Sequence, residues 1–345
     1  MTEFRSDNGL TVLVVIVNFN SGTLLHDAII GVHKQTYRSW KLVVADNAST
    51  DGSAEHLEEM FPNVKVIRSP KNVGFAAANN LAVTKAPGAS WIALLNPDAI
   101  PHSRWLEELV AATRVHPGFG SFSSRTLTAH APDILDGAGD VYHVSGKYWR
   151  RGSGCPDSSR YAAKQEVFSA CAAAALYSAK AWSDVGGMDE DFFCYGEDVD
   201  LGFRMQLAGY RCMYVPTAQA VHHGSAITGR HSNFSVYHGH RNLMWTYFKN
   251  MPWPLFWLYL PQHFLLNLVT IVWFALRGQG RVMLMAKRDA LKGLPRIWRE
   301  RKKIQSKRRV SAWELRRVMA KSLFRPYFTH RIRGIVKKNA GKIDR

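Results

Sequence analysis

The stretch LTVLVVIVNFN, residues 10–20, is a continuous apolar run that ends in polar side chains. A run without alternation between polar and apolar residues is typical of a strand that is buried on both faces of a parallel sheet. Helical stretches separate it from three further apolar runs: KLVVA at 41–45, NVKVI at 63–67 and WIALL at 91–95. This βαβαβαβ order predicts an α/β fold with a right-handed, doubly wound, mostly parallel sheet.

The helices of this unit have recognisable start signals. We expect Ser21 to cap a helix that runs through residue 34, and Pro101 to begin a helix that ends near residue 115. Residues 117–160 lack this order, so we expect hairpins there instead of further βαβ units. The remaining expected elements are helices at 54–60, 74–85 and 232–249, a short helix within 186–211, and strands at 210–216 and 218–222.

Polar motifs stand at the carboxyl ends of three predicted strands: NFN at 18–20, DNAST at 46–50 and NPD at 96–98. Ligands of doubly wound sheets bind beyond these strand ends, so the motifs predict a ligand site. The sequence has no Walker A motif and no GxGxxG after the first strand, and GAGD at 137–140 is too weak a match to replace it. A P-loop or a standard dinucleotide-binding fold is therefore not expected.

Asp98 and Asp46, at two of these strand ends, each have two interpretations. Asp98 could hold Mg²⁺ or Mn²⁺ together with a diphosphate, since hard cations prefer carboxylate oxygens, or it could cap the following helix. Asp46 could accept a hydrogen bond from a base or a ribose, or it could belong to a turn. His222 and His223 follow a strand-like segment, and one of them could complete a metal site with Asp98.

A dense group of acids precedes and opens the short helix near residue 200. A helix N-terminus favours carboxylates, which explains one or two of these acids but not the whole group. Repulsion among neighbouring carboxylates raises the pKa of some of them, which suits a general base. The group comprises Asp189, Glu190, Asp191, Glu197, Asp198 and Asp200.

Six motifs occur in one order along the chain: VVIVNFNS, VVADNASTDGS, NVGFAAANN, LLNPDA, GGMDEDFFCYGEDVDLGFR and AVHHGS. With this set the chain resembles the inverting glycosyltransferase family 2, whose members have the GT-A fold. Within that family it looks most like the bacterial rhamnosyltransferase-type members, which build O-antigen, exopolysaccharide or cell-wall linker glycans. The resemblance covers residues 11–250. It implies a metal-dependent, inverting transfer of a sugar from a nucleotide donor to a hydroxyl group.

The resemblance also implies a set of donor-binding residues. Asp46 would bind the base of the sugar nucleotide, and Asn18 would lie near the same pocket. Asn72 and Gly74 would line the pocket for the nucleotide and the donor sugar. Asn96 stands where the family's DxD motif has its first aspartate, and an amide is a weaker metal ligand than a carboxylate.

For the metal and the chemistry, the resemblance implies the following roles. Asp98 would be the metal-binding aspartate of the motif, and His222 a further ligand of Mg²⁺ or Mn²⁺, with His223 as the alternative. Asp198 would be the catalytic base that removes the acceptor proton, and Glu197 would orient it or contact the acceptor. We expect dTDP-rhamnose as the donor, while UDP-hexoses and UDP-galactofuranose stay open.

The charge of the chain is concentrated at its carboxyl end. Of a net charge of +18, residues 277–345 carry 23 Lys and Arg against 4 Asp and Glu, and residues 1–276 are near neutral. The preceding stretch, 250–276, has no charged residue and contains three tryptophans, which favour the water–lipid interface. This combination predicts attachment to an anionic membrane surface. Nucleic acid binding and a buried helix with a solvated tail are the alternatives.

The apolar stretch is not expected to span a membrane. Pro252, Pro254 and Pro261 should interrupt a helix there. Sugar nucleotides are made in the cytosol, and the basic tail should stay on the same side of the membrane. We therefore expect a peripheral or monotopic element on the cytoplasmic face of the inner membrane, close to a polyprenyl diphosphate-linked glycan acceptor.

The predicted GT-A catalytic domain spans 1–230, with a nucleotide-binding half at 1–116 and an acceptor and catalytic half at 117–230. A membrane-associating segment at 231–276 and a basic helical tail at 277–345 follow. A nucleotidyltransferase would show a Gly-rich phosphate loop near the amino terminus, and a nucleic-acid-binding protein would leave the strand-end acids unexplained. A degenerate transferase would explain Asn96, but the intact Asp98 and Asp198 argue against it. The oligomeric state cannot be read from the sequence.

Overall fold

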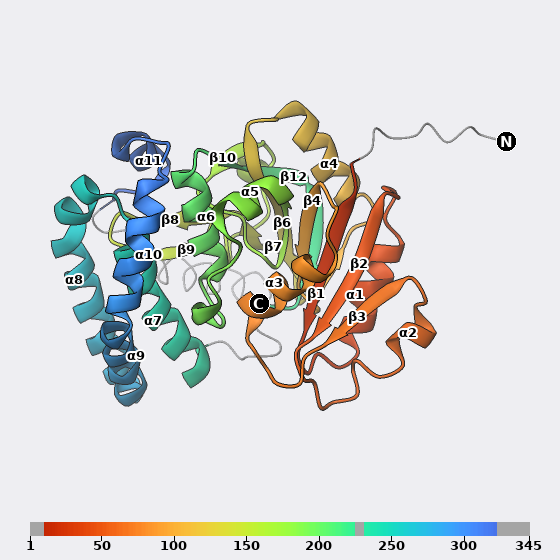
Figure 1. Cartoon of the computed structure of the whole chain (residues 1–345), viewed down its shortest axis with the longest axis horizontal. Helices are drawn as coiled ribbons and strands as arrows, with labels where there is room; N and C mark the ends of the chain where they lie inside the picture. Colours follow the sequence, from red (N-terminus) through yellow and green to blue (C-terminus); the bar gives the residue numbers. More distant parts are fainter. Residues whose placement is uncertain (1–9, 225–230, 323–345) are drawn as a thin grey trace, which may run out of the picture.

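The computed structural model describes residues 10–224 and 231–322. Its centre is a mixed sheet to which both halves of the expected catalytic domain contribute strands (Figure 1). The strand order is β10-β12-β6-β11-β4-β1-β2-β3, and β5 and β7 pair with β12 and β6 respectively. This arrangement confirms the predicted α/β fold.

The first half of the sheet is parallel, as the sequence predicts. β1 (Val12–Asn18) lies between β2 (Trp40–Asp46) and β4 (Trp91–Leu95), and β3 (Val64–Arg68) pairs with β2. Every residue of β1 is buried. A strand of this kind must be covered on both faces, which explains its unbroken apolar sequence.

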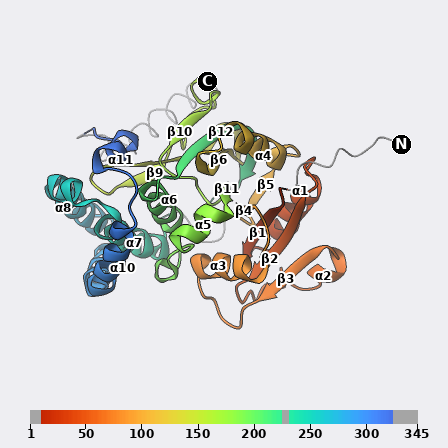
Figure 2. The same cartoon turned by 45° about the horizontal axis from the view of Figure 1, so that its top comes forward.

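Helices cover the two faces of the sheet (Figure 2). Val12, Val14 and Ile16 of β1 enter a core with helices α1, α2 and α4, whereas Leu13, Val15 and Val17 enter a second core with α3, α5 and α6. Full burial of each such side chain contributes about 1.5–3 kcal/mol. The helices span Leu24–His33 (α1), Leu57–Met60 (α2), Phe75–Lys85 (α3), Trp105–Val115 (α4), Ala179–Val185 (α5) and Glu197–Leu207 (α6).

The predicted hairpins lie in the second half of the expected catalytic domain. β6 (Phe119–Thr128) and β7 (Ala131–Ala138) are antiparallel neighbours, and β8 (Asp140–Tyr142) and β9 (Tyr148–Arg150) form a separate two-stranded sheet. The strands predicted at 210–216 and 218–222 are one strand, β12, whose register against β6 shifts around Pro216. The remaining elements are β5 (Ala99–Pro101), β10 (Gln165–Val167), β11 (Ala174–Ser178), β12 (Arg211–His222), η1 (Ser159–Tyr161) and η2 (Glu190–Phe192).

Two predicted helix starts are wrong. Pro101 belongs to β5 instead of α4, because β5 pairs with β12 and the proline ring packs directly on Gly31 of α1. Ser21 does not cap α1 with its side chain. The helix begins three residues later, at Leu24, whose N–H donates to the backbone carbonyl of Ser21.

Helices α7 to α11 lie beside the second half of the sheet (Figure 1). The proposed boundaries at 230 and 276 fall just before α7 and between α8 and α9. Ser232 caps α7 by accepting a hydrogen bond from the Ser235 N–H. The helices span Asn233–Asn250 (α7), Trp253–Ala275 (α8), Gly280–Lys292 (α9), Leu294–Ser306 (α10) and Ala312–Val318 (α11).

Helix α8 is continuous, so the predicted interruption by prolines is wrong. Pro252 is its N-cap and Pro254 lies in its first turn, where a backbone N–H has no partner within the helix. Pro261 lies inside and removes one backbone hydrogen bond without ending the helix. Within residues 10–224 and 231–322, α8 is the one helix long and apolar enough to cross a membrane.

Ion pairs join α7 and α10 to the acidic segment before α6 and to α6 itself. The Lys249 Nζ, on a side chain that is 1% exposed, lies 2.6 Å from Asp189 and 2.8 Å from Asp200. Arg296 lies 3.1 Å from Asp189 and 2.8 Å from Asp191. Removing one partner of a buried pair typically costs about 3–5 kcal/mol. Asp189 and Asp200, whose side chains are 14% and 0% exposed, therefore stabilise the fold, whereas the Asp191 side chain is 59% exposed.

Candidate functional site

A cleft of about 710 Å³ opens at the carboxyl ends of β1 and β4. Its volume lies in the range of small-molecule sites. Seven of the predicted site residues line it, from both halves of the expected catalytic domain. They are Asn72, Gly74, Asn96, Asp98, Glu197, Asp198 and His222.

Asn18 and Asp46 lie behind the cleft wall. The Asn18 Nδ2 is 2.9 Å from the Asp46 Oδ1, and equally close to the Ser49 and Ser53 hydroxyls. Both Asn18 and Asp46 are buried. The two side chains are thus hydrogen-bonded to each other, and their predicted role in donor binding stays a prediction.

Asn47, which sequence reasoning missed, lines the cleft in their place. Its Nδ2 donates to the Asn72 Oδ1 at 2.8 Å, and its Oδ1 accepts from the Val73 N–H at 2.8 Å. The Asn72 Oδ1 also accepts from the Gly74 N–H at 2.9 Å. Two amides therefore fix the loop that leads into α3. The signal was available, since Asn47 is part of the DNAST motif at a strand end.

Gly74 is required where the two halves of the catalytic domain meet. Its φ is +87°, in the left-handed region. A Cβ at this position would lie 2.6 Å from the Phe193 carbonyl oxygen and 2.8 Å from its Cα. Only glycine permits both this backbone conformation and this close approach.

Asp98 and His222 form a buried pair at the centre of the cleft lining. The His222 Nε2 lies 3.2 Å from the Asp98 Oδ1, and its Nδ1 lies 2.9 Å from the Asp136 Oδ2. Burial alone would lower the pKa of His222, but hydrogen bonds with Asp136 and Asp98 raise it. His223 takes no part in this pairing: its backbone N–H donates to the Asp98 carbonyl, and its ring contacts His130 edge-on.

This arrangement fits a divalent cation. When the Nδ1–H of His222 donates a hydrogen bond to Asp136, its Nε2 presents a lone pair beside Asp98. A carboxylate that binds the other ring nitrogen in this way commonly orients a metal-binding histidine. The Arg150 Nη1 donates to the same Asp136 Oδ2 that His222 contacts, and it lies 3.3 Å from the His222 Nδ1. The Asn96 Nδ2 is 3.5 Å from the His222 Nε2, so a flip of the amide, which exchanges its nitrogen and oxygen, would bring the carbonyl oxygen to this position.

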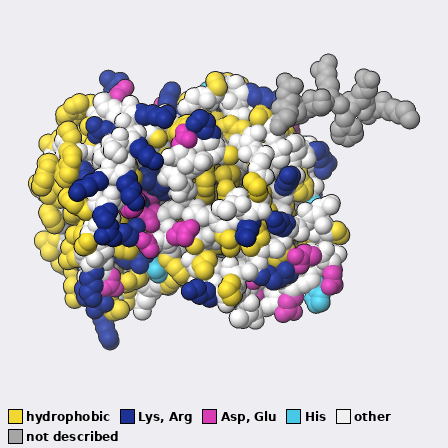
Figure 3. Space-filling view, in the orientation of Figure 1, with side chains coloured by type: hydrophobic (Ala, Val, Ile, Leu, Met, Phe, Trp, Pro, Cys, Tyr) yellow, Lys and Arg dark blue, Asp and Glu magenta, His cyan; other side chains and the backbone are white. Residues whose placement is uncertain are grey.

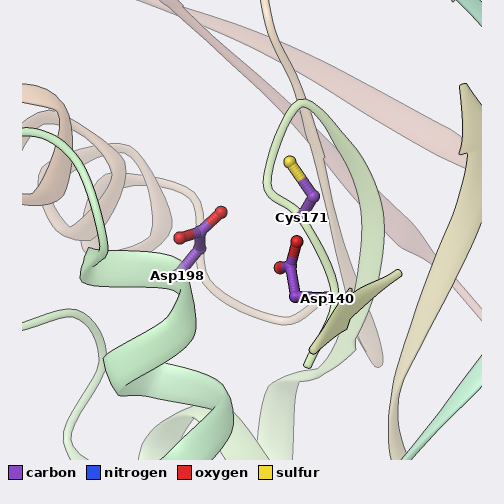
Figure 4. A group of neighbouring side chains, drawn as sticks. All are labelled: Asp140, Cys171 and Asp198. Carbon is purple, nitrogen blue, oxygen red and sulfur yellow. The ribbon is translucent and has the colours of Figure 1, made fainter. Parts of the chain in front are cut away.

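Asp198 begins a second group of acids in the same cleft. It is the second residue of α6, and its carboxylate accepts hydrogen bonds from the Ala172 N–H at 3.1 Å and the Val199 N–H at 2.8 Å. These two backbone donors hold the carboxylate in place. Figure 4 shows the Asp198 side chain directed toward Asp140 and Cys171, with the ligand atoms of all three within 4.8 Å of one another.

The titratable neighbours of Asp198 have raised pKa values. Burial, together with the Asp198 charge, raises the pKa of Asp140 and of Glu197 well above the usual range. Burial likewise raises the pKa of the Cys171 thiol. Asp198 differs from these groups in that its carboxylate accepts two backbone hydrogen bonds. Asp198 stays the predicted base, and Asp98 and His222 stay the predicted metal ligands.

Asp136 and Asp140 were also missed by sequence reasoning. They flank the GAG of the segment DGAGD at 136–140, which leads from β7 into β8. Gly139 has a φ of +83° and lets the chain turn there. The turn places one aspartate beside His222 and the other beside Asp198. The sequence pattern that could have indicated them is a pair of aspartates separated by Gly-Ala-Gly.

Comparison with known proteins identifies the family and the fold. Residues 13–120 match the model of glycosyl transferase family 2, and residues 91–286 match that of glycosyl transferase family group 2. The N-acetylglucosaminyl-diphospho-decaprenol L-rhamnosyltransferase of Mycobacterium tuberculosis is 27% identical over 242 residues, which is 63% of this chain and 77% of that relative.

Two solved structures show a similar fold. The crystal structure of GalNAc-T7 with UDP, GalNAc and Mn²⁺ superposes with a TM-score of 0.57 at 18% identity, covering 70% of this chain and 48% of that chain. The mannosyltransferase PcManGT from Pyrobaculum calidifontis, in complex with GDP-Man and Mn²⁺, gives a TM-score of 0.51 at 17% identity. The match covers 86% of this chain and 84% of that chain.

Proposed function

Because the chain belongs to glycosyl transferase family 2 and has the GT-A fold, we propose that it transfers L-rhamnose from dTDP-rhamnose to a lipid-linked glycan. The observation that carries this proposal is the meeting of the Asp98–His222 pair and Asp198 in one cleft. The rhamnosyltransferase relative, whose name specifies a diphospho-decaprenol-linked N-acetylglucosamine, supports the sugar and the acceptor class. A UDP-sugar is the alternative donor.

The proposed chemistry is a single displacement. Asp198 accepts the proton of the acceptor hydroxyl as that oxygen attacks the anomeric carbon, and its backbone hydrogen bonds keep the carboxylate in place. Asp98 and His222 would hold Mg²⁺ or Mn²⁺, which neutralises charge on the departing diphosphate. One displacement inverts the anomeric configuration.

Donor choice is testable on the full-length protein. Of a panel of dTDP-, UDP- and GDP-sugars with Mn²⁺, we expect dTDP-rhamnose to raise the melting temperature most. We also expect slow release of its nucleoside diphosphate without an acceptor and fast release with a lipid-linked N-acetylglucosamine. Thermal shift and a nucleoside diphosphate assay measure both. A larger response to a UDP-sugar would show that the donor is that sugar and not dTDP-rhamnose. If no donor released its nucleoside diphosphate, the proposed function would be rejected.

We further propose that α8 and α9 rest on the cytoplasmic face of the membrane. His263 and Asn267, which the sequence places in the middle of α8, are buried against the protein, and the His263 Nδ1 lies 2.8 Å from the Ser145 carbonyl. The outer face of α8 is consequently apolar and aromatic. Figure 3 shows hydrophobic side chains along this edge of the molecule. The exposed members are Trp253, Trp257, Leu258, Phe264, Leu265, Leu268, Val269, Val272, Trp273 and Leu276.

The outer face of α9 mixes apolar and basic residues. Leu284, Met285 and Leu291 are exposed together with Arg281, Arg288 and Lys292, at helical spacing. A helix with apolar and basic side chains on its solvent face suits an interface with anionic lipid. This arrangement favours a helix that lies on the membrane over one that crosses it, and it brings the cleft to a lipid-linked acceptor.

Acidic residues on α8 should release the protein from lipid. Leu268 is 59% exposed, so Leu265→Glu with Leu268→Glu should leave the fold unchanged. Since each buried leucine is worth about 1.5–3 kcal/mol, we expect at least a tenfold weaker partition to vesicles containing phosphatidylglycerol. Co-sedimentation measures this, with Met60→Glu on α2 as the control. Unchanged sedimentation of the double variant would contradict the proposal.

A further inference from the structure

The loop between η2 and α6 has a strained backbone. Phe193 has a φ of 64° and a ψ of −64°, and the Cys194 N–H donates to the Phe192 carbonyl at 2.7 Å, which makes Phe193 the centre of a γ-turn. Tyr195 has a φ of 70°. Turns of this type are rare, and left-handed conformations are costly for bulky residues. Such strain persists where the surroundings impose it, often at ligand sites.

Helix α7 holds this loop in place. The Asn242 Nδ2 lies 2.9 Å from the Phe192 carbonyl, 3.0 Å from the Cys194 carbonyl and 2.8 Å from the Tyr195 carbonyl. The side chain of Asn242 is fully buried. Arg241 adds a bond to the Phe192 carbonyl at 2.9 Å. The backbone of the turn is therefore fixed from one side by two consecutive residues of α7.

The strained loop presents aromatic rings to the cleft. Phe193 and Tyr195 line it, and so does Phe234 from the first turn of α7. The Phe234 ring centroid is 6.2 Å from that of Phe193 and 6.1 Å from that of Tyr195. Phe234 is 38% exposed, although its ring is wholly apolar. These three residues are called the aromatic platform below.

Polar atoms line the same part of the cleft without protein partners. The Glu197 Oε2, on a carboxyl that is 95% buried, has no hydrogen-bond partner within the described residues. The same holds for the Tyr148 hydroxyl across residues 10–224 and 231–322. Both side chains line the cleft, and Glu197 directly precedes Asp198. Buried polar atoms of this kind are costly unless a ligand satisfies them.

We infer that the aromatic platform, with Glu197 and Tyr148, is the subsite for the acceptor sugar ring that carries the attacking hydroxyl. This inference rests on the proposed function. A pyranose ring has an apolar C–H face, which an aromatic ring covers, and an edge of hydroxyl groups, which carboxyl and phenol oxygens bind. A prenyl chain would suit the platform but would leave the Glu197 and Tyr148 oxygens unsatisfied. A sugar ring satisfies both and places a hydroxyl beside Asp198.

Two substitutions test the platform without threatening the fold. Phe234→Ala removes an exposed ring. Tyr195→Gly removes a ring and relieves the left-handed strain, because glycine adopts positive φ readily, so the melting temperature should stay the same or rise. With farnesyl diphosphate-linked N-acetylglucosamine as the probe, we expect each variant to raise the acceptor KM about threefold to tenfold. Trp313→Ala on α11, which removes an exposed ring outside the cleft, is the control.

The readouts separate the two proposals. Donor-dependent thermal shift and nucleoside diphosphate release without acceptor should be equal in wild type and variants, and no release by wild type would reject the proposed function itself. Saturation-transfer NMR should mark the sugar protons of the probe on wild type, and Phe234→Ala should weaken this signal. Wild-type acceptor KM values in both variants, saturation confined to the prenyl protons, or no saturation on wild type would overturn the subsite.

Discussion

The substitution Asp198→Asn should lower the turnover of sugar transfer by about 10²–10⁴-fold, the usual effect of removing a general base. Asparagine has the same shape, and its one side-chain oxygen can still accept either the Ala172 or the Val199 N–H, so α6 should still begin at the same residue. An amide cannot take up the acceptor proton. Donor binding should therefore persist, and steady-state kinetics together with donor thermal shift would show the split.

A matched pair of variants makes this result specific. Asp140→Asn tests the other carboxyl of the same group, whose pKa is raised by burial and by the Asp198 charge, and should reduce turnover much less. Asp27→Asn, on the exposed side of α1, should change nothing. Retention of more than about a tenth of the wild-type turnover by Asp198→Asn would place the base elsewhere. A larger loss in Asp140→Asn would assign that role to Asp140.

The substitution Asp98→Ala should abolish metal-dependent nucleotide binding and lower turnover by about 10²-fold or more, since a bound cation supplies several kcal/mol to a developing charge. EDTA in excess should have the same effect on the wild-type protein. Calorimetric titration with Mn²⁺ and a nucleoside diphosphate, followed by activity assays, would measure both effects. Full activity in EDTA would show that transfer needs no divalent metal and would contradict the metal-binding role proposed for Asp98.

Two variants of residues near His222 should differ in metal affinity. Asp136→Asn keeps His222 in place but weakens its orienting partner, and we expect metal affinity to fall about tenfold to 100-fold. His223→Ala removes the adjacent imidazole, which does not contact the Asp98 carboxylate, and should leave metal affinity unchanged. Equal losses in both variants would contradict the assignment to His222.

The nucleotide-binding half was largely predictable from the sequence, because its signals are local. A strand covered on both faces must be apolar throughout, so the apolar runs mark β1, β2 and β4 directly. The two wrong helix starts show the limit of this reasoning. Pro101 has the residue type of a helix start, but the pairing of β5 with β12, more than 100 residues away, determines its conformation.

The roles within the acid group were not predictable, because charge pairing depends on distant residues. Nothing in the sequence distinguishes Asp198 from three neighbouring aspartates, Asp189, Asp191 and Asp200. In the structure these three form ion pairs with Lys249 and Arg296, which lie 49 to 107 residues away in the sequence. Asp198 instead bonds to backbone amides and faces the cleft. The polar residues of α8 follow the same rule, since the packing of α8 decides that His263 and Asn267 face inward.

By itself the sequence determined the α/β fold, the edge of the sheet that carries the site, the family and the position of the apolar segment. The fold, the sheet edge and the apolar segment follow from the order of apolar and polar residues, and the family follows from the resemblance of six ordered motifs. The tertiary structure alone decided that His222 and not His223 meets Asp98, that Asp136 and Asp140 join the site, and that a strained loop brings aromatic rings beside Asp198. The reason is that hydrogen bonds and ion pairs depend on distances of a few ångströms between residues far apart in sequence, which residue order does not specify.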